Sequence, residues 1–187
     1  YGLDAPAVRA LAVALRRMPA LRALSLDGEN AALWGIAATA ELLRASGAEA
    51  APRLRSFSAC SVELEEEGVR ALAATGWRLE ELDLSRNRDL DAAGVATLAA
   101  APTFALRRLT LQGCGLDAAT VLAVANAPWP LEELDFSENG FSDVDGPALA
   151  ALSRHAGLRK LDVSYCNLSA AGFKALVEAA WPALTSL

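Results

Sequence analysis

The sequence contains very little lysine: of its 187 residues only Lys160 and Lys174 are lysine, and the net charge is −6. A protein that binds duplex nucleic acid needs a stripe of basic side chains to displace the counterions of the phosphates, and no run of lysine or arginine occurs here. No apolar stretch reaches the roughly eighteen residues that a membrane-spanning helix requires. We therefore expect neither nucleic acid nor a membrane as a partner.

The sequence is also poor in the residues that most often carry chemistry. Its three cysteines, Cys60, Cys114 and Cys166, are far apart and odd in number, which favours reduced thiols in an intracellular, cytoplasmic setting over a disulfide framework. The one histidine, His155, has no nucleophile or further metal ligand beside it in the motif pattern, so we expect it to be exposed at a helix end. No phosphate-binding loop occurs. We predict no enzymatic activity, no cofactor, no metal and no small-molecule substrate.

What the sequence does contain is one block that is written several times. Residues 79–86 read LEELDLSR, residues 131–138 read LEELDFSE, and residues 106–113 read LRRLTLQG. Such blocks begin near residues 21, 54, 79, 106, 131 and 158, and a truncated one begins at 184. Most fit L-x-x-L-x-L-x-x-N/C, in which alternate leucines point inward and the residues between them face solvent. We predict a short strand in each block.

Each of the later strands is followed by an asparagine or a cysteine: Asn87, Cys114, Asn139 and Cys166. An inward-turned asparagine can hydrogen-bond the backbone groups that leave the strand ladder. A cysteine in the same place acts as a small buried hydrophobe, so we predict a structural role for Cys114 and Cys166. Cys60 falls on a predicted strand and has no such explanation.

A helical pattern follows each block. Apolar residues three and four apart mark residues 90–101, 116–127, 145–155 and 168–180, each with Asp or Ser near its start. Residues 1–17 read as a helix without its strand, and the long first block adds a helical segment around Trp34 and a loop at 44–53. Aromatic residues recur just before the next block, which predicts packing at the helix-to-strand corner by Trp77, Phe104, Trp129 and Trp181.

These blocks, over nearly the whole chain, resemble leucine-rich repeats. The paired spacing and the G-x-x-A-L-A segment beginning at Gly68 resemble the ribonuclease-inhibitor-like superfamily, and within it the cysteine-containing and GALA-like repeats. The resemblance implies an α/β solenoid shaped as a curved horseshoe, with parallel strands on the concave face and helices on the convex face. We expect residues 1–187 to form one domain of about six repeats, with partial repeats at both ends, excerpted from a longer array.

The charges alternate in sign from block to block. The second positions are Arg55, Glu80, Arg107, Glu132 and Arg159, and the third positions are Glu81, Arg108, Glu133 and Lys160. Since 54, 106 and 158 are 52 residues apart, as are 79 and 131, the repeating unit is a pair of blocks. Neighbouring parallel strands place equivalent positions side by side, so we predict two ladders of alternating charge that fix the sheet register.

The resemblance also implies that the molecule binds a partner protein along its concave face. We expect the third, fifth and seventh positions of each block to face that side and the eighth to lie at its rim. Acidic and hydroxyl side chains dominate there, which suits a partner with a basic patch. The candidate contact residues are Asp83, Arg86, Arg108, Thr110, Glu133, Asp135, Glu138, Lys160, Asp162 and Tyr165.

Two alternatives stay open at this point. The array could be the substrate-recognition part of a ubiquitin ligase, as in F-box proteins with leucine-rich repeats, or a regulator of a small GTPase, since the Ran GTPase-activating protein has similar repeats. Residues 135–146 open like a calcium loop, but Gly146 stands where that loop needs a bidentate glutamate, and the repeat itself prescribes Asp135 and Ser137. We therefore predict no calcium site.

Overall fold

The computed structural model describes residues 5–27, 36–46, 51–141 and 146–187. The prediction around Trp34, residues 47–50 of the predicted 44–53 loop and residues 142–145 of the 135–146 segment lie outside the described residues. Residues 44–46 of that predicted loop are helical instead, because the helix that begins at Ile36 continues to Ser46. Six strands form one sheet of parallel neighbours in chain order, β1 to β6. Each strand begins two residues after the leucine that opens its block. The strands are β1 Ala23–Ser25, β2 Ser56–Ser58, β3 Glu81–Asp83, β4 Arg108–Thr110, β5 Glu133–Asp135 and β6 Lys160–Asp162.

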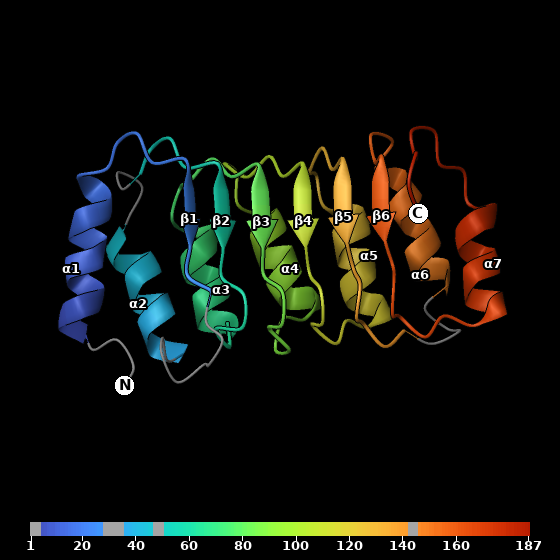
Figure 1. Ribbon diagram of the computed structural model, residues 1–187, viewed down its shortest axis with the longest axis horizontal. Helices are drawn as coiled ribbons and strands as arrows, with labels where there is room; N and C mark the ends of the chain where they lie inside the picture. Colours follow the sequence, from blue (N-terminus) through green and yellow to red (C-terminus); the bar gives the residue numbers. More distant parts are fainter. Residues whose placement is uncertain (1–4, 28–35, 47–50, 142–145) are drawn as a thin grey trace.

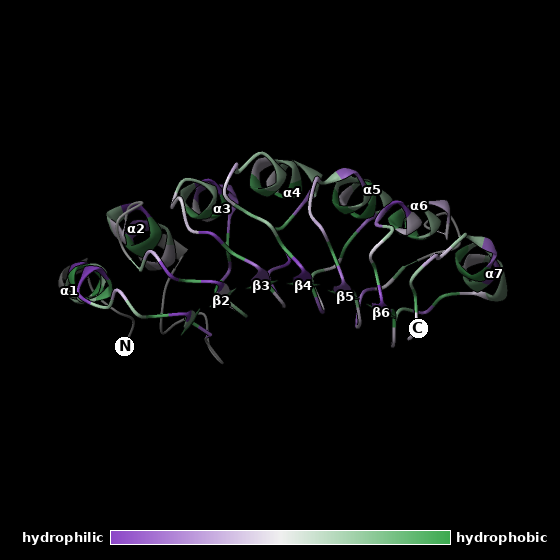
Figure 2. Cartoon of the chain, turned by 90° about the horizontal axis from the view of Figure 1, so that it is seen from above, coloured by the Kyte–Doolittle hydropathy of each residue, from purple (hydrophilic) through white to green (hydrophobic). Residues whose placement is uncertain are grey.

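Helices alternate with the strands along the chain and lie on one side of the sheet (Figure 1). Seen from above, the chain forms an arc with the strands on its inner side and the helices on its outer side (Figure 2). The curved α/β solenoid expected from the repeat pattern is therefore confirmed. The helical elements are α1 Ala5–Arg16, α2 Ile36–Ser46, α3 Glu66–Ala73, α4 Ala92–Ala99, α5 Ala118–Asn126, α6 Gly146–Ala151 with the 3-10 turn η2 Leu152–Arg154, and α7 Ala170–Glu178.

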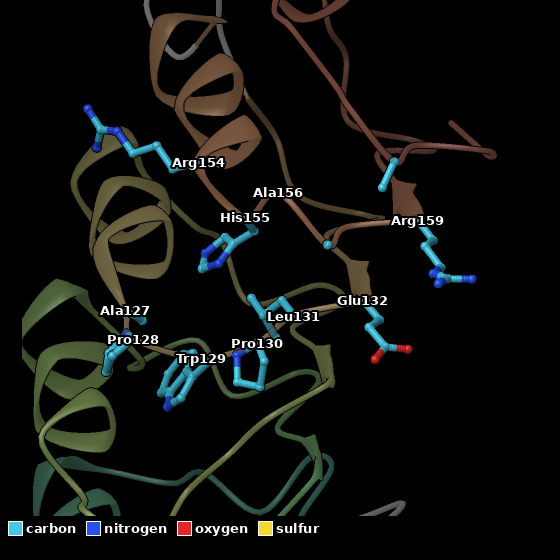
Figure 3. A pocket seen from close by; sticks show the side chains of 12 residues that line it. Ala127, Pro128, Trp129, Pro130, Leu131, Glu132, Arg154, His155, Ala156 and Arg159 are labelled. Carbon is cyan, nitrogen blue, oxygen red and sulfur yellow. The ribbon is translucent and has the colours of Figure 1, made fainter.

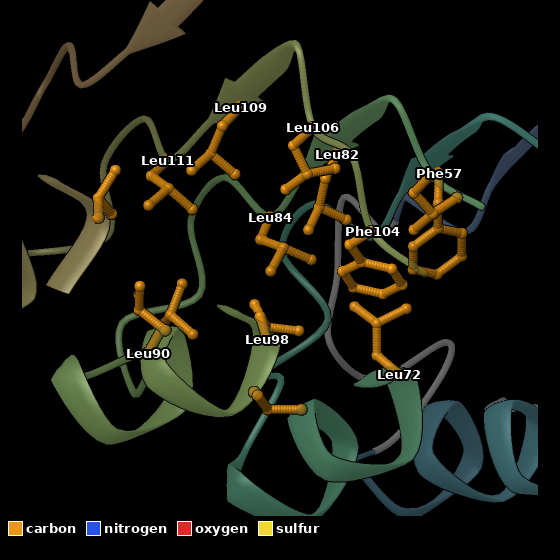
Figure 4. Close-up of a cluster of buried hydrophobic side chains, with 14 of the residues drawn as sticks. Phe57, Leu72, Leu82, Leu84, Leu90, Leu98, Phe104, Leu106, Leu109 and Leu111 are labelled. Atoms are coloured by element: carbon orange, nitrogen blue, oxygen red, sulfur yellow. The ribbon is translucent and has the colours of Figure 1, made fainter. Parts of the chain in front are cut away.

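The core lies between the sheet and the helices. In the third strand's block, Leu79, Leu82 and Leu84 are all at most 1% exposed, as the alternating pattern requires. Leu98 of α4 packs toward these strand leucines from the outer layer (Figure 4). The inward leucines of every block join one continuous cluster, so each repeat buries its apolar face against its neighbours.

The helix starts follow the predicted caps. Asp91 Oδ1 accepts a hydrogen bond of 2.8 Å from the Gly94 N–H, and Asp117 Oδ1 accepts one of 2.8 Å from the Thr120 N–H. The pKa of Asp117 is lowered, chiefly by the Thr120 hydroxyl and then by its N–H. Glu65 stands at the same place before α3 and makes no side-chain capping bond, because its longer side chain does not return to its own backbone.

The inward asparagine behaves as predicted. Asn87 is fully buried; its Nδ2 donates to the carbonyls of Ala59, Leu84 and Ser85, and its Oδ1 accepts the Leu64 N–H at 2.9 Å. Asn139 repeats this arrangement one 52-residue unit later. The asparagine therefore satisfies turns of its own repeat and of the preceding one.

The cysteines of the same slot do less. The Cys114 thiol is buried and donates to the Leu84 carbonyl at 3.3 Å, and Cys166 donates to the Phe136 carbonyl at 3.1 Å. Their structural role is confirmed. Cys60, however, does not lie on a strand: β2 ends at Ser58, and Cys60 is half-buried in the following turn, because only positions three to five of a block are paired as strand.

His155 contradicts the sequence prediction. Its side chain is only 8% exposed, and its Nε2 lies 2.9 Å from the Val124 carbonyl oxygen near the end of α5. The ring packs on the neighbouring repeat and donates to the Val124 carbonyl, which also accepts the Ala127 N–H at 3.0 Å. A helix-end histidine can meet the carbonyls of the next helix as readily as solvent, which the sequence alone did not reveal.

Candidate protein-binding face

The strand register brings the predicted contact residues together on the inner face of the sheet. Glu81, Arg108, Glu133 and Lys160 are register partners in successive strands from β3 to β6. Two residues further along the same strands is a second row of register partners, so the eight candidates of the third and fifth positions share one face. The second row is Asp83, Thr110, Asp135 and Asp162.

The third-position row is an ion-pair ladder. The Arg108 guanidinium lies 3.3 Å from a Glu81 carboxylate oxygen and 3.0 Å from Glu133, which it contacts through two nitrogens. These hydrogen bonds lower the pKa of Glu133 and raise that of Arg108. Lys160 also lowers the pKa of Glu133 through its charge. The third-position charges therefore largely neutralise one another.

The second-position ladder pairs only within each two-block unit. Arg55 lies 3.3 Å from Glu80, and Arg107 pairs with Glu132. In residues 51–141 and 146–187, Arg159 has no carboxylate within ion-pair distance, because Thr185 stands in the next block. The predicted ladders are confirmed, except that Lys160 and Arg159 end them without an ion pair among the described residues.

The aspartates of the fifth position are partly used by their own backbone. In Asp83, Asp135 and Asp162, the Oδ1 accepts the N–H of the residue two further on at 2.9 Å. The pKa of Asp162 is lowered first by the Ser164 hydroxyl and then by its N–H. One carboxylate oxygen thus holds the turn that leaves each strand, while the charge stays on the concave surface. The D-x-S spacing signals this turn, and the sequence analysis did not use it.

The seventh position faces solvent only in part of the array: Asp27 and Ser164 are exposed there, whereas the residues of the other blocks are buried or half-buried. Ser85 is 3% exposed and Ser137 is 7% exposed, because the chain already turns toward the helices there. Gln112 at this position is half-buried, and its Nε2 donates to Glu138 Oε1 at 2.7 Å. This contact, which the sequence analysis missed, orients Glu138 at the rim.

The eighth position forms a rim of exposed side chains on left-handed backbone. Arg86, Glu138 and Tyr165 have φ values of 61°, 59° and 56°, and all three are exposed, Tyr165 to 86%. Gly113 has the same conformation, with φ of 64°, and avoids the cost of roughly 1–2 kcal/mol that a side chain brings there. The rim therefore carries three large polar or aromatic side chains where glycine would be less strained.

The tenth position alternates in backbone conformation. Glu63, Gly115 and Asn167 are left-handed, whereas Arg88 and Gly140, at the same position of the intervening blocks, are not. The left-handed residues follow Val62, Cys114 and Cys166, and the others follow the inward asparagines. The backbone thus repeats every two blocks, as the 52-residue spacing predicts.

Asp27 forms a further network of hydrogen bonds on the concave face, next to β1 and β2. Asp27 accepts hydrogen bonds from the Ser58 hydroxyl, from the Cys60 N–H at 2.9 Å and from the Ser25 hydroxyl at 2.7 Å. Burial raises the pKa of Asp27, but these bonds together outweigh it, so the pKa lies below its ordinary value. Asp27 ties the first strand to the second instead of presenting a free carboxylate.

The face has shallow hollows and no sign of a metal centre in what the structure describes. One hollow of about 220 Å³ lies over β4, β5 and β6 and is lined by Arg108, Glu133, Asp135 and Lys160 among others. Across residues 5–27, 36–46, 51–141 and 146–187, no three His, Cys, Asp or Glu side chains gather as a metal would require. None of the described helices is long and apolar enough to span a bilayer.

The comparison with known families supports the repeat pattern at two places in the chain. A family model for the leucine-rich repeat matches residues 79–99 and residues 158–177. These two stretches are similar to leucine-rich repeats. No curated protein matches the chain. The two matched stretches comprise β3 with α4 and β6 with α7, which are the strand–turn–helix units that the geometry defines. Leucine-rich repeats generally mediate protein–protein interactions.

Proposed function

We propose that this leucine-rich-repeat array is a non-catalytic scaffold that binds a partner protein on its concave face, and that the partner presents a basic patch. The observation that carries the proposal is a surplus of negative charge on β3 to β6. At the third, fifth and eighth positions of these four blocks, six carboxylates stand against three cations. The carboxylates are Glu81, Asp83, Glu133, Asp135, Glu138 and Asp162; the cations are Arg86, Arg108 and Lys160.

The surplus is not spread evenly. Arg108 is shared by Glu81 and Glu133, so the uncompensated charge falls on the aspartates and on Glu138. Asp135 and Asp162 are direct register partners, so two like charges stand side by side on adjacent strands. A cationic side chain of a partner would relieve this repulsion, and charge complementarity of this kind raises association rates and selects partners.

The size and chemistry of the face support the same proposal. Six strands about 4.8 Å apart give an arc of ~25 Å, enough to contribute the ~800 Å² that one partner buries in a standard interface. Tyr165 and Arg86, exposed at the rim, are of the residue types that most often anchor interfaces. The 52-residue alternation further supports placing the repeats in the ribonuclease-inhibitor-like branch.

The proposal is tested by capturing partners from cell lysate with the full chain and with a charge-neutralised variant. The variant is Asp135→Asn, Glu138→Gln and Asp162→Asn. Each change removes the charge, and the amide oxygen of asparagine can still accept the turn hydrogen bonds that Asp135 and Asp162 accept. A control neutralises three exposed helix carboxylates, by Glu66→Gln, Glu67→Gln and Glu178→Gln.

We expect a partner retained by the parent and the control to be reduced at least about tenfold by the concave variant, and to be released as salt rises through ~0.3 M. Equal retention by all three folded proteins would mean that the concave carboxylates are solvated scaffold. Recognition would then have to lie on another surface.

A further inference from the structure

The helix-to-strand corner before the block that opens at Leu158 lacks the large ring found at the three preceding corners. Trp77, Phe104 and Trp129 each stand two residues before the leucine of the next block, and all three are buried. In the block that opens at Leu158 the same position is Ala156, a short and exposed side chain. His155 turns its ring inward there, but an imidazole is smaller than an indole. A cavity of about 420 Å³ remains between the α5–β5 corner and the η2–β6 corner.

The cavity has one apolar side and one polar side. Trp129, Pro130 and Leu131 lie along the connection that enters β5, and His155 faces them from the end of η2 (Figure 3). The imidazole Nε2 is committed to the Val124 carbonyl, which accepts but cannot donate, so in the neutral ring Nδ1 is a free acceptor. A volume of this size accommodates an aromatic side chain, the residue class that fills the three preceding corners.

The mouth of the cavity carries cations without carboxylate partners. Arg159 borders it and, in the described part of the chain, has no carboxylate within ion-pair distance, although Arg55 and Arg107 at the same position are paired. Arg154 borders it from the helix side and binds the neutral Asn126 Oδ1 at 2.6 Å. Glu132, the one carboxylate of the lining, is already engaged by Arg107.

This repeat therefore lacks the large corner ring that precedes the blocks at 79, 106 and 131. It also lacks the glutamate that pairs with the second-position arginine of the blocks at 54 and 106. We propose that the cavity is a docking site for a partner peptide whose aromatic side chain is flanked by carboxylates. The ring fills the corner beside Trp129 and Pro130, and the acidic groups pair with Arg159 and Arg154. Buried aromatic anchors with a charged surround are typical of interface hot spots.

The site goes beyond the function proposed above. It lies at the edge where the chain enters the strands, whereas the acidic face and the rim lie along and beyond them, and the charge that it favours has the opposite sign. A basic partner on the concave face and an acidic aromatic segment at this corner could belong to one ligand or to two, so each site has its own test.

The test uses the isotopically labelled full chain and three capped peptides followed by amide and indole NMR shifts. The peptides are Gly-Glu-Trp-Glu-Gly, Gly-Lys-Trp-Lys-Gly and Gly-Glu-Ala-Glu-Gly. The protein variants are Arg159→Glu, which reverses the mouth charge, and Ala156→Trp, which fills the cavity. Arg22→Glu is the matched control, because Arg22 is the exposed second-position arginine at the far end of the array.

We expect the Glu-Trp-Glu peptide to shift Gly157 and the Trp129 indole, with a dissociation constant of about 1 mM or below. Arg159→Glu should weaken this binding about tenfold, Ala156→Trp should abolish it, and Arg22→Glu should leave it unchanged. Arg159→Glu alters only an exposed side chain, so it decides the outcome even if Ala156→Trp does not fold.

Three results would overturn the proposal. Shifts of equal size with Glu-Ala-Glu would reduce the site to surface charge, and equal shifts with Lys-Trp-Lys would reduce it to an apolar hollow. The absence of saturable shifts at Gly157 and Trp129 would leave the cavity without this ligand. None of these results bears on the concave face, whose variants are Asp135→Asn, Glu138→Gln and Asp162→Asn.

Discussion

At the scale of single residues, the slot after each strand shows how one position accepts two chemistries. Asn87 satisfies one N–H and three carbonyls, whereas Cys114 donates its thiol to carbonyls only. Both are buried, and the backbone that follows them differs, left-handed at Gly115 and not at Arg88. Asparagine and cysteine are therefore not interchangeable at this position, even though the repeat pattern allows either residue.

Asn87→Ala should lower the free energy of unfolding by about 3 kcal/mol, because it leaves several buried backbone groups without partners. Cys114→Ala removes a small apolar volume and a weak donor, so we expect a loss of about 1 kcal/mol. Urea unfolding followed by circular dichroism measures both. A loss for Cys114→Ala as large as that for Asn87→Ala would contradict the distinction.

The thiols of Cys60 and Cys114 should differ in reactivity because Cys114 is buried and Cys60 is only half-buried. Burial raises the pKa of the Cys114 thiol to about 11, so at pH 8 only about one molecule in a thousand carries the thiolate that reacts. Cys60 is half-buried in a turn. We expect iodoacetamide to label Cys60 in the native protein and Cys114 only in urea, as read by peptide mass spectrometry. Rapid native labelling of Cys114 at pH 8 would contradict its burial.

At the scale of the element, capping residues set where the helices begin, and side-chain ladders help to set the register of the strands. Helices α4, α5 and α7 begin at Asp or Ser caps that could be identified from the sequence, since a short polar side chain returns to its own backbone. The strands are only three residues long, so side-chain ladders add to the register that the buried leucines set.

Asp117→Ala should cost about 1 kcal/mol of stability at pH 7, and Glu65→Ala, at a cap position without a capping bond, should cost almost nothing. The pKa of Asp117 is lowered in the folded protein, so its contribution is present above the unfolded pKa of about 4 and is lost as pH falls through the folded value. Denaturation at pH 7 and pH 2.5 checks this. A difference between Asp117→Ala and the parent that persisted at pH 2.5 would contradict the charged cap.

Arg108→Glu should destabilise the sheet by about 1–2 kcal/mol, because it places like charges beside Glu81 and Glu133. The double variant Glu81→Arg/Arg108→Glu restores an opposite pair between β3 and β4 and keeps Glu133 beside Lys160, so it should recover part of the loss. Thermal unfolding at low and high salt measures both, and the deficit of the single variant should shrink as salt screens it. An equal deficit in the double variant would show that the ladder does not set the register.

At the scale of the whole molecule, the sequence predicted the solenoid, the order of strands and the two charge ladders, because each depends on a period that repetition amplifies. It did not predict the burial of His155 or the hollow beside Ala156, since both depend on how one irregular corner packs against its neighbour. The surface candidates are harder still. The register places the third- and fifth-position residues on one face, but Asp83, Asp135 and Asp162 hold turns as well as charge, so their residue type alone does not identify a binding role.

We propose that the concave face of β3 to β6 recognises the partner. Amide hydrogen exchange of the full chain, free and bound to the captured partner at ~0.1 M salt, shows which segments the partner covers. We expect binding to slow exchange in the segments that carry the rim, residues 84–88, 111–115, 136–140 and 163–167, and to leave helices α3 to α5 unchanged. Protection confined to the helices, with the rim segments unaltered, would contradict the claim.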